Sequence, residues 1–318
     1  MVPASATRPA LELDAQYRAL REEAGVVIDH DRAVCEIAGP EAAEFLQGQL
    51  TNDIEAIEAG SGCYAALLDR KGKMRSDMEV LRVTDEIYWL ITPAAPAAEV
   101  KHHLSMYKVG REVEVSSTER SVIRLIGPRG IELLNNKPIG PSYANRARRL
   151  AERDCLAVVS DIGIELIADS EVDAEEIVAS LEQAGAAPVE MRALDIVRVE
   201  AGIPAFGREM GNDTIPQEAG INDRAVSFSK GCYIGQETVA RLHYKGKPNR
   251  HLRRLRSADV LVEGAELSAG DKIVGHLGTA VISPARGPLA LAILRREAEP
   301  GAEVVVGGSA GAIVEEIA

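Results

Sequence analysis

The chain has few aromatic residues and no long apolar run. Aromatic side chains make up only 3% of its 318 residues, so we expect a core built mainly from Ala, Val, Leu and Ile. No stretch of roughly 18 apolar residues occurs, and no apolar signal core follows Met1, which predicts a protein without a membrane span. The net charge of −13 argues against broad binding to nucleic-acid phosphates.

Cysteine is also scarce, and no two of the four cysteines form a Cys-x-x-Cys pair. This spacing supports neither a compact zinc site nor a disulfide scaffold. Free thiols fit a reducing compartment, so we expect a cytoplasmic protein. The four residues are Cys35, Cys63, Cys155 and Cys232.

Several motifs of common active sites are missing too. The sequence contains no Walker loop and no Gly-x-Gly-x-x-Gly after a strand, so nucleotide binding has no support. Gly-x-Ser-x-Gly is absent, which removes the usual sign of a serine hydrolase. His102 and His103 are adjacent and cannot share a helix face, and the segment Asp29-His30-Asp31 is predicted as a turn. We therefore expect no metal site.

The order of apolar runs and turns predicts an α+β protein of two parts. Strands alternate with helices, but neighbouring strands are often joined by tight turns, such as residues 69–72 between strands expected at 64–68 and 74–83. This favours mixed α+β layers over a doubly wound parallel sheet. After Arg250, glycines separate short apolar runs, as in a small β-barrel. We expect a body of two interleaved α+β subdomains over residues 1–249, beginning with a loose tail, and a barrel over 250–318.

Helices are expected where apolar residues recur at helical spacing. One begins near Leu13 and ends before Gly25, and another follows Pro96. The remaining helices are expected at 172–183, 189–200 and 235–243.

One run stands out chemically: Lys230-Gly231-Cys232-Tyr233-Ile234-Gly235-Gln236-Glu237. A thiol just before a helix start feels the positive end of the helix dipole, and Lys230 adds a second positive field; both favour the thiolate. Cys232 is therefore a candidate reactive or ligand-contacting thiol. The alternative is a small buried hydrophobic residue, which is how most free cysteines behave.

This run resembles the signature of the folate-binding YgfZ family. That family is related to the aminomethyltransferase (T-protein) of the glycine cleavage system and to mitochondrial iron–sulfur assembly factors. Further blocks are similar and come in the same order: Phe45 to Asp53, Leu67 to Lys73, Arg198 to Pro204 and Ile215 to Gly220. The resemblance implies a T-protein-like body ending in a small barrel. It also implies tetrahydrofolate or a one-carbon derivative as cofactor, and an accessory role in iron–sulfur cluster assembly or repair.

The resemblance assigns folate contacts to two carboxylates. Glu200 stands at the end of an expected helix, where its carboxylate could pair with the amino-pyrimidinone edge of a pterin, much as carboxylates bind nucleobases. Asp77 shares a strand face with Arg75 and Glu79, so the residues alone predict a solvated charge. In aminomethyltransferases the same hairpin carries paired acids, one of which contacts folate. Ser76 takes the place of the first, which counts against aminomethyl transfer.

The resemblance places further residues at the same ligand. Cys232 is expected to face the folate cavity, with Lys230 and Asp77 as the other candidate catalytic groups. T-proteins have an arginine where Gln236 stands, and glutamine cannot supply that charge to the ligand's carboxylates. Arg241 or Lys230 could supply it. Further ligand contacts are expected from Gln217, Tyr233 and Gln236 itself, although residues 214–217 also fit a helix capping box.

Three functions remain open at this point. The first is a folate-binding accessory protein for iron–sulfur clients, in which Cys232 needs a partner because a cluster takes about four protein ligands. The second is a folate-dependent one-carbon (aminomethyl) transferase. The third is an interaction module that kept the fold and lost the ligand.

Overall fold

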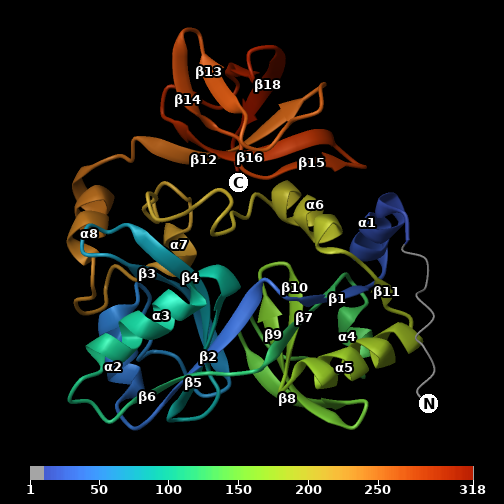
Figure 1. Ribbon diagram of the computed structural model, residues 1–318, viewed down its shortest axis with the longest axis vertical. Helices are drawn as coiled ribbons and strands as arrows, with labels where there is room; N and C mark the ends of the chain where they lie inside the picture. Colours follow the sequence, from blue (N-terminus) through green and yellow to red (C-terminus); the bar gives the residue numbers. More distant parts are fainter. Residues whose placement is uncertain (1–10, 318) are drawn as a thin grey trace.

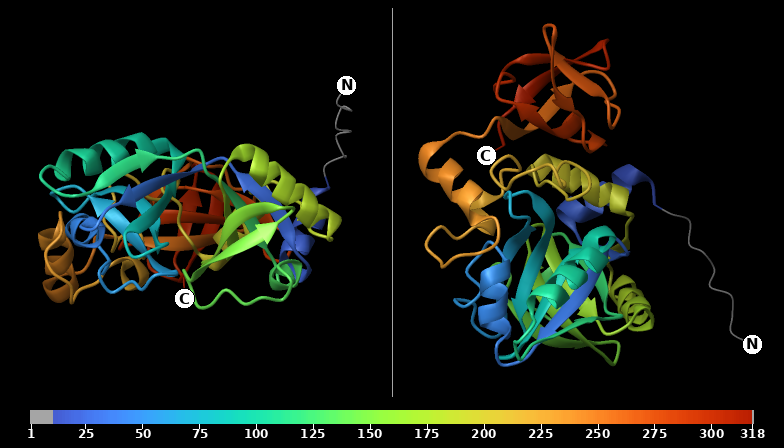
Figure 2. Two further views of the ribbon diagram at one scale, coloured as in Figure 1. Left: turned by 90° about the horizontal axis from the view of Figure 1, so that it is seen from below. Right: turned by 60° about the vertical axis from the view of Figure 1, so that its left-hand side comes forward.

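The computed structural model describes residues 11–317, so the loose tail expected for residues 1–10 lies outside the described residues. Three β-sheets organise the chain. Two lie side by side, and the third lies across one end of both (Figures 1 and 2). The predicted α+β layers are confirmed. No helix in the described range is both long enough and apolar enough to cross a membrane.

The first sheet has five antiparallel strands in the order β3-β4-β5-β2-β6. Two helices cover one face of it, α2 (Ala42–Gln49) and α3 (Ala94–Tyr107). Strands β3 and β4 form the predicted hairpin, and Asp69 accepts hydrogen bonds from two backbone N–H groups of its turn. The strands are β2 (Arg32–Ala38), β3 (Ser61–Leu68), β4 (Met74–Arg82), β5 (Ile87–Pro93) and β6 (Glu114–Ser117).

The second sheet has six strands in the order β11-β1-β7-β10-β9-β8, and only the short β11 runs parallel to its neighbour. Its outer face packs against α5 (Glu171–Gln183), which Ser170 caps by accepting the N–H of Asp173. The short helix α4 (Gly130–Leu133) lies beside it. The strands are β1 (Gly25–Asp29), β7 (Ser121–Ile126), β8 (Asn145–Leu150), β9 (Arg153–Ser160), β10 (Gly163–Ala168) and β11 (Ala187–Pro188).

The two sheets share a core where their inner faces meet. Trp89 and Leu81 of the five-stranded sheet pack there with Val122 and Leu156 of the six-stranded sheet. Because this core covers the second face of β4, polar residues on that face are buried with it. The chain passes from one sheet to the other through the turn between β1 and β2, at the predicted Asp29-His30-Asp31.

The third sheet has seven strands in the order β14-β13-β17-β18-β12-β16-β15, all antiparallel. It curls into a half-barrel around its own apolar core, which confirms the predicted C-terminal barrel. It begins at Arg250; the division into two folding units at 249/250 stays a prediction. The strands are β12 (Arg250–Ser257), β13 (Glu266–Ala269), β14 (Lys272–His276), β15 (Ala280–Ser283), β16 (Gly287–Arg295), β17 (Glu303–Val306) and β18 (Ala310–Glu315).

Helix α6 (Met191–Ala201) joins the body to the third sheet. One side of it packs on α1 (Leu13–Glu22) through Leu194 and Val197. The other side packs Val199 against Leu252 and Leu291 of the half-barrel. Gly202 ends the helix in the left-handed conformation, with φ of 73°, as C-terminal caps often do. Two short helices, α7 (Asn222–Ala225) and α8 (Gln236–Lys245), complete the body.

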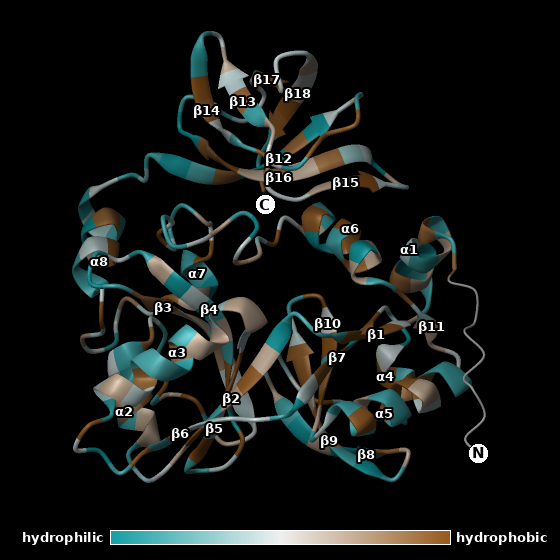
Figure 3. Cartoon of the chain, in the orientation of Figure 1, coloured by the Kyte–Doolittle hydropathy of each residue, from teal (hydrophilic) through white to brown (hydrophobic). Residues whose placement is uncertain are grey.

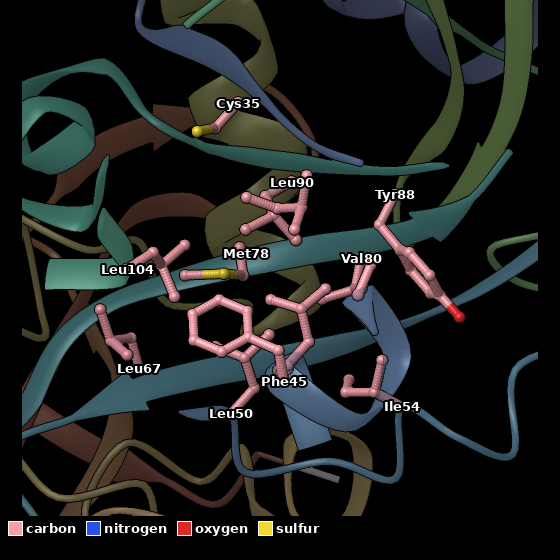
Figure 4. Packing of buried hydrophobic residues seen from close by; sticks show 14 of the residues in the cluster. Cys35, Phe45, Leu50, Ile54, Leu67, Met78, Val80, Tyr88, Leu90 and Leu104 are labelled. Atoms are coloured by element: carbon pink, nitrogen blue, oxygen red, sulfur yellow. The ribbon is translucent and has the colours of Figure 1, made fainter. Parts of the chain in front are cut away.

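The cores contain few aromatic side chains, as the composition predicts. Around Phe45, the cluster under α2 and α3 is filled mainly by Leu, Ile, Val and Ala (Figure 4). Hydrophobic residues concentrate in central strands such as β7, whereas β8 and β12 are largely hydrophilic (Figure 3).

Candidate functional site

A cavity of about 590 Å³ opens where the two body sheets meet α6. This size suits a small-molecule ligand. Its wall combines apolar groups with many charged ones, and the segment 203–208 after α6 closes one side. Lining residues include Arg32, Tyr64, Asp77, Glu79, Arg124, Asp161, Met191, Arg192, Leu194, Phe206, Arg208 and Arg224.

Asp77 is a buried carboxylate of this cavity. Its side chain lies on β4 with only 5% of the residue exposed, so the solvated charge predicted from strand alternation is wrong. The Tyr64 hydroxyl donates to Oδ2 at 2.6 Å. Burial raises the pKa of Tyr64, as does the charge of Asp77, so the phenol keeps its proton and remains a donor. Oδ1 is buried and has no hydrogen-bond partner among residues 11–317.

An acceptor left in this state is costly, because a buried charged oxygen without a donor loses hydration and gains nothing. A ligand N–H placed against Oδ1 would remove that cost. The cavity therefore fits a ligand that presents a hydrogen-bond donor to Asp77.

Ser76 lies on the opposite side of β4 from Asp77. Its hydroxyl is 2.7 Å from that of Thr92, both residues are fully buried, and neither is among the described residues that line the cavity. Successive side chains of a strand point to opposite faces. A serine in place of an acid at position 76 therefore takes no carboxylate away from the cavity. Ser76 counts less strongly against aminomethyl transfer than the sequence alone suggested.

Beside Asp77, a buried ion cluster forms the rest of the wall. Arg124 donates to Asp29 at 2.9 Å and to Glu165, while Arg32 lies 3.3 Å from Glu79. Sequence reasoning missed this cluster. A signal was present, because Arg124 and Glu165 each interrupt an otherwise apolar strand, in Ser-Val-Ile-Arg-Leu-Ile and Gly-Ile-Glu-Leu-Ile-Ala.

Glu200 lies outside the cavity wall in the described chain. Its carboxylate accepts from the hydroxyl of Tyr17 at 3.0 Å and from Arg21 and Ser283. These contacts tie α6 to α1 and to β15. The predicted folate contact stays a prediction, but three donors already occupy the carboxylate in this structure.

The segment after α6 is held by a different ion pair. Arg198 donates to the carbonyl of Ile203 at 2.8 Å and to Glu209 at 2.9 Å. Glu209 in turn accepts from the N–H groups of Ala205 and Thr279. The wall that carries Phe206 and Arg208 is therefore fixed to both α6 and the half-barrel.

Lys230 secures the loop after α2. Its ammonium donates to the carbonyls of Gln47, Leu50 and Asn52 at 2.6, 2.8 and 2.6 Å. Burial lowers its pKa to about 8. Two of the sequence blocks that carry the family resemblance, the run from Lys230 and the block from Phe45 to Asp53, thus contact each other directly through this lysine.

Gly235 lets the same run approach the β3–β4 hairpin closely. It has φ of +85°, and a Cβ there would stand 2.5 Å from the carbonyl oxygen of Asp69 and 3.2 Å from Cα of Gly72. Only glycine lets the start of α8 approach the β3–β4 hairpin so closely.

Cys232 is exposed, whereas Cys35 and Cys155 are buried and Cys63 is partly buried. It is not one of the described residues lining this cavity, and its expected place at the folate stays a prediction. Within residues 11–317, no group of three or more His, Cys, Asp or Glu side chains could hold a metal ion.

The remaining predicted contacts also lie away from the described cavity wall. Tyr233 is buried, with its ring centroid 5.2 Å from the Lys230 ammonium. Gln236 begins α8, and Arg241 is exposed on it. Gln217 donates to the carbonyl of Val239 at 2.8 Å. Their roles in binding stay predictions, and the arginines of the wall are the groups that sequence reasoning overlooked.

The capping box predicted at residues 214–217 is wrong. The hydroxyl of Thr214 accepts from the N–H of Gly211, and residues 216–220 form turns rather than a helix. Pro216 follows Ile215 in the chain. The carboxylate of Glu218 accepts the N–H of Ile215.

Comparison with known proteins gives consistent results. The pattern of the GCVT N-terminal domain family matches residues 10–230. An aminomethyltransferase of Corynebacterium aurimucosum is 27% identical over 92% of this chain and 84% of its own. An uncharacterized protein of Haemophilus influenzae is 27% identical over 68% of this chain and 67% of its own.

A solved structure shares the fold. The crystal structure of the glycine cleavage system aminomethyltransferase T from Bartonella henselae superposes with a TM-score of 0.86 at 21% identity, covering 96% of this chain and 88% of that one. The T-protein-like fold predicted from the sequence is confirmed.

Proposed function

Since the chain belongs to the family of the GCVT N-terminal domain, we propose that it binds tetrahydrofolate or a one-carbon derivative in the central cavity. One observation carries this proposal: Oδ1 of Asp77 is buried in the cavity wall and lacks a donor among the described residues. The amino-pyrimidinone edge of a pterin presents N–H groups that suit a carboxylate, as bases do in nucleic-acid recognition.

Other residues of the wall fit the rest of such a ligand. Met191, Leu194 and Phe206 provide apolar surface for the ring. Arg192 and Arg208 line the cavity and are exposed, so they can receive the carboxylates of a glutamate tail. They would supply the charge that Gln236 lacks.

We further propose a YgfZ-type accessory role in iron–sulfur cluster assembly or repair in the cytoplasm. The support is the run from Lys230 to Glu237 and the exposure of Cys232, the most accessible of the four thiols. One cysteine cannot hold a cluster by itself, so Cys232 would act on a client protein at the surface while folate binds inside.

Anaerobic calorimetric titration of tetrahydrofolate tests the binding proposal. Wild-type protein should bind one equivalent, and Asp77→Asn, which keeps the shape but loses the charge, should bind roughly 10-fold to 100-fold more weakly, since hydrogen bonds to charged groups contribute about 1.5–3 kcal/mol. Glu175→Gln, at an exposed position of α5, removes a carboxylate charge away from the cavity. Its tetrahydrofolate affinity should match that of wild type. No saturable binding to wild type would overturn the proposal.

Folate-dependent aminomethyl transfer is the second candidate function. The observation that favours it is the position of Ser76, which bonds to Thr92 away from the cavity and leaves Asp77 in place. Transfer of a one-carbon unit by purified protein, with turnover unchanged in Cys232→Ser, would favour the transferase. Absence of turnover together with tight folate binding would favour the accessory role.

A further inference from the structure

The ion cluster beside Asp77 contains more acid than base. Three carboxyl groups, Asp29, Glu79 and Glu165, lie with two guanidinium groups, Arg32 and Arg124. They come from five different strands or strand ends, and their side chains are between 0% and 13% exposed. If all five groups were ionised, the cluster would carry one net negative charge, and this charge would be buried away from water.

Two oxygens of this cluster have no donor. Oε1 of Glu79 faces Arg32 and Oε1 of Glu165 binds Arg124. The second oxygen of each, Oε2, is buried without a hydrogen-bond partner in the described part of the chain. Two neighbouring buried carboxyl groups are costly to ionise together.

We propose that Glu79 is a second ligand-contacting carboxyl of the cavity, that it holds a proton at neutral pH, and that it donates this proton in a hydrogen bond to an acceptor on the folate ring. This inference rests on the proposed folate site. Glu79 lines the cavity, whereas Glu165 is fully buried and is not one of the described lining residues. The proton is therefore offered to a ligand from Glu79.

The position of Glu79 on the strand supports the contact. Glu79 and Asp77 are two residues apart on β4 and point to the same face, about 7 Å apart along the strand. Asp77 accepts and Glu79 donates. This pattern suits a ligand that presents a donor and an acceptor several ångströms apart.

The charges around Glu79 agree with this protonation state. The pKa of Glu79 is raised to about 8, mainly by burial and then by the charge of Glu165, while Arg32 and Arg124 act in the opposite direction. Asp77 and Asp29 also face the cluster and add negative charge at Arg32. Tyr143 lies nearby, but its hydroxyl donates to Asp161 at 2.6 Å.

Two measurements test the proposal. Infrared spectroscopy of the ligand-free protein at neutral pH should show the carbonyl band of a protonated carboxylic acid, and Glu79→Gln should remove it. Titration of tetrahydrofolate should show wild-type affinity falling about tenfold between roughly pH 7 and pH 9, as one proton is lost near pH 8. Glu79→Gln keeps a donor and should change less than twofold over the same range.

Each outcome has a defined meaning. A pH slope in Glu79→Gln equal to that of wild type would overturn the ligand contact, because the slope would then come from the folate or another group. An unchanged infrared band in that variant would overturn the protonation of Glu79. If wild type bound no folate at any pH, the proposed function and the ligand contact would both fail, and the band would still decide the protonation of Glu79.

Discussion

The hydroxyl of Tyr64 donates to one oxygen of Asp77 at 2.6 Å and leaves the other oxygen facing the cavity. The tyrosine thereby fixes the orientation of the carboxylate before any ligand arrives. A positioned acceptor binds more tightly than a mobile one, because less freedom is lost on binding.

Tyr64→Phe should therefore weaken tetrahydrofolate binding. We expect a loss of about 5-fold to 10-fold, the contribution of roughly one hydrogen bond, measured by calorimetry. Tyr143→Phe is the matched control, since it removes a buried phenol that donates to Asp161 of the same wall and not to Asp77. Equal loss of affinity in both variants would show that the effect is general loosening of the cavity.

Glu79 should make stability depend on pH. Its folded pKa, about 8, lies above the ordinary value of 4.5, so the native state binds more protons than the unfolded state between these values. The contribution of Glu79 to the free energy of unfolding is favourable near pH 4.5. It is lost as the pH rises to about 8. The Tm of Glu79→Gln minus that of wild type should therefore increase by at least about 2 °C from pH 5 to pH 8. A constant difference would contradict this assignment.

Cys232 should be the fast-reacting thiol. Burial raises the pKa of Cys35 and Cys155 to about 11 and that of Cys63 to about 12, so these three present little thiolate at neutral pH. A thiol reagent should label about one cysteine per chain quickly, identified by mass spectrometry as Cys232. Cys232→Ala should lose the fast phase and keep its folate affinity, since the thiol lies outside the cavity wall. A large loss of affinity would place the thiol at the ligand.

Glu200 should contribute mainly to the stability of the fold rather than to folate binding. Ser283→Ala and Tyr17→Phe each remove a partner of Glu200 without touching the cavity wall. Each should lower the free energy of unfolding by about 1–2 kcal/mol, as loss of a hydrogen bond to a charged group does, and leave folate affinity within twofold. If Glu200→Gln weakens binding far more than these two variants do, the predicted pterin contact of Glu200 is supported instead.

Lys230 should be a structural residue of the cysteine run. Lys230→Met removes three hydrogen bonds to buried carbonyls, and we expect it to cost about 3 kcal/mol or more in urea unfolding. Lys247→Met, at an exposed position, should cost less than about 0.5 kcal/mol. Near-equal stability of the two variants would contradict the structural role.

Local signals predicted much of the fold. The turn at 69–72, the helix ended by Gly202 and the change of character after Arg250 all depend on residues close in sequence, and all agree with the structure. Edge strand β6 (Glu114–Ser117) was harder to place from local residues. Its register is set by pairing with β2, which is distant in sequence.

The site was harder to predict because its groups come from distant segments. Alternation along β4 correctly separated Asp77 from Met78, but it could not show that a second sheet buries the Asp77 side as well. Lys230 and Cys232 are two residues apart and were expected to act together. The structure directs the lysine into the α2 loop and leaves the cysteine exposed.

The most direct test of the folate site is an anaerobic crystal structure of the protein with tetrahydrofolate. We predict the ring in the cavity between β4 and α6, with an N–H group within hydrogen-bond distance of Oδ1 of Asp77. A ring bound elsewhere, for example beside α8 near Cys232, or a ring in the cavity that does not contact Asp77, would contradict this account.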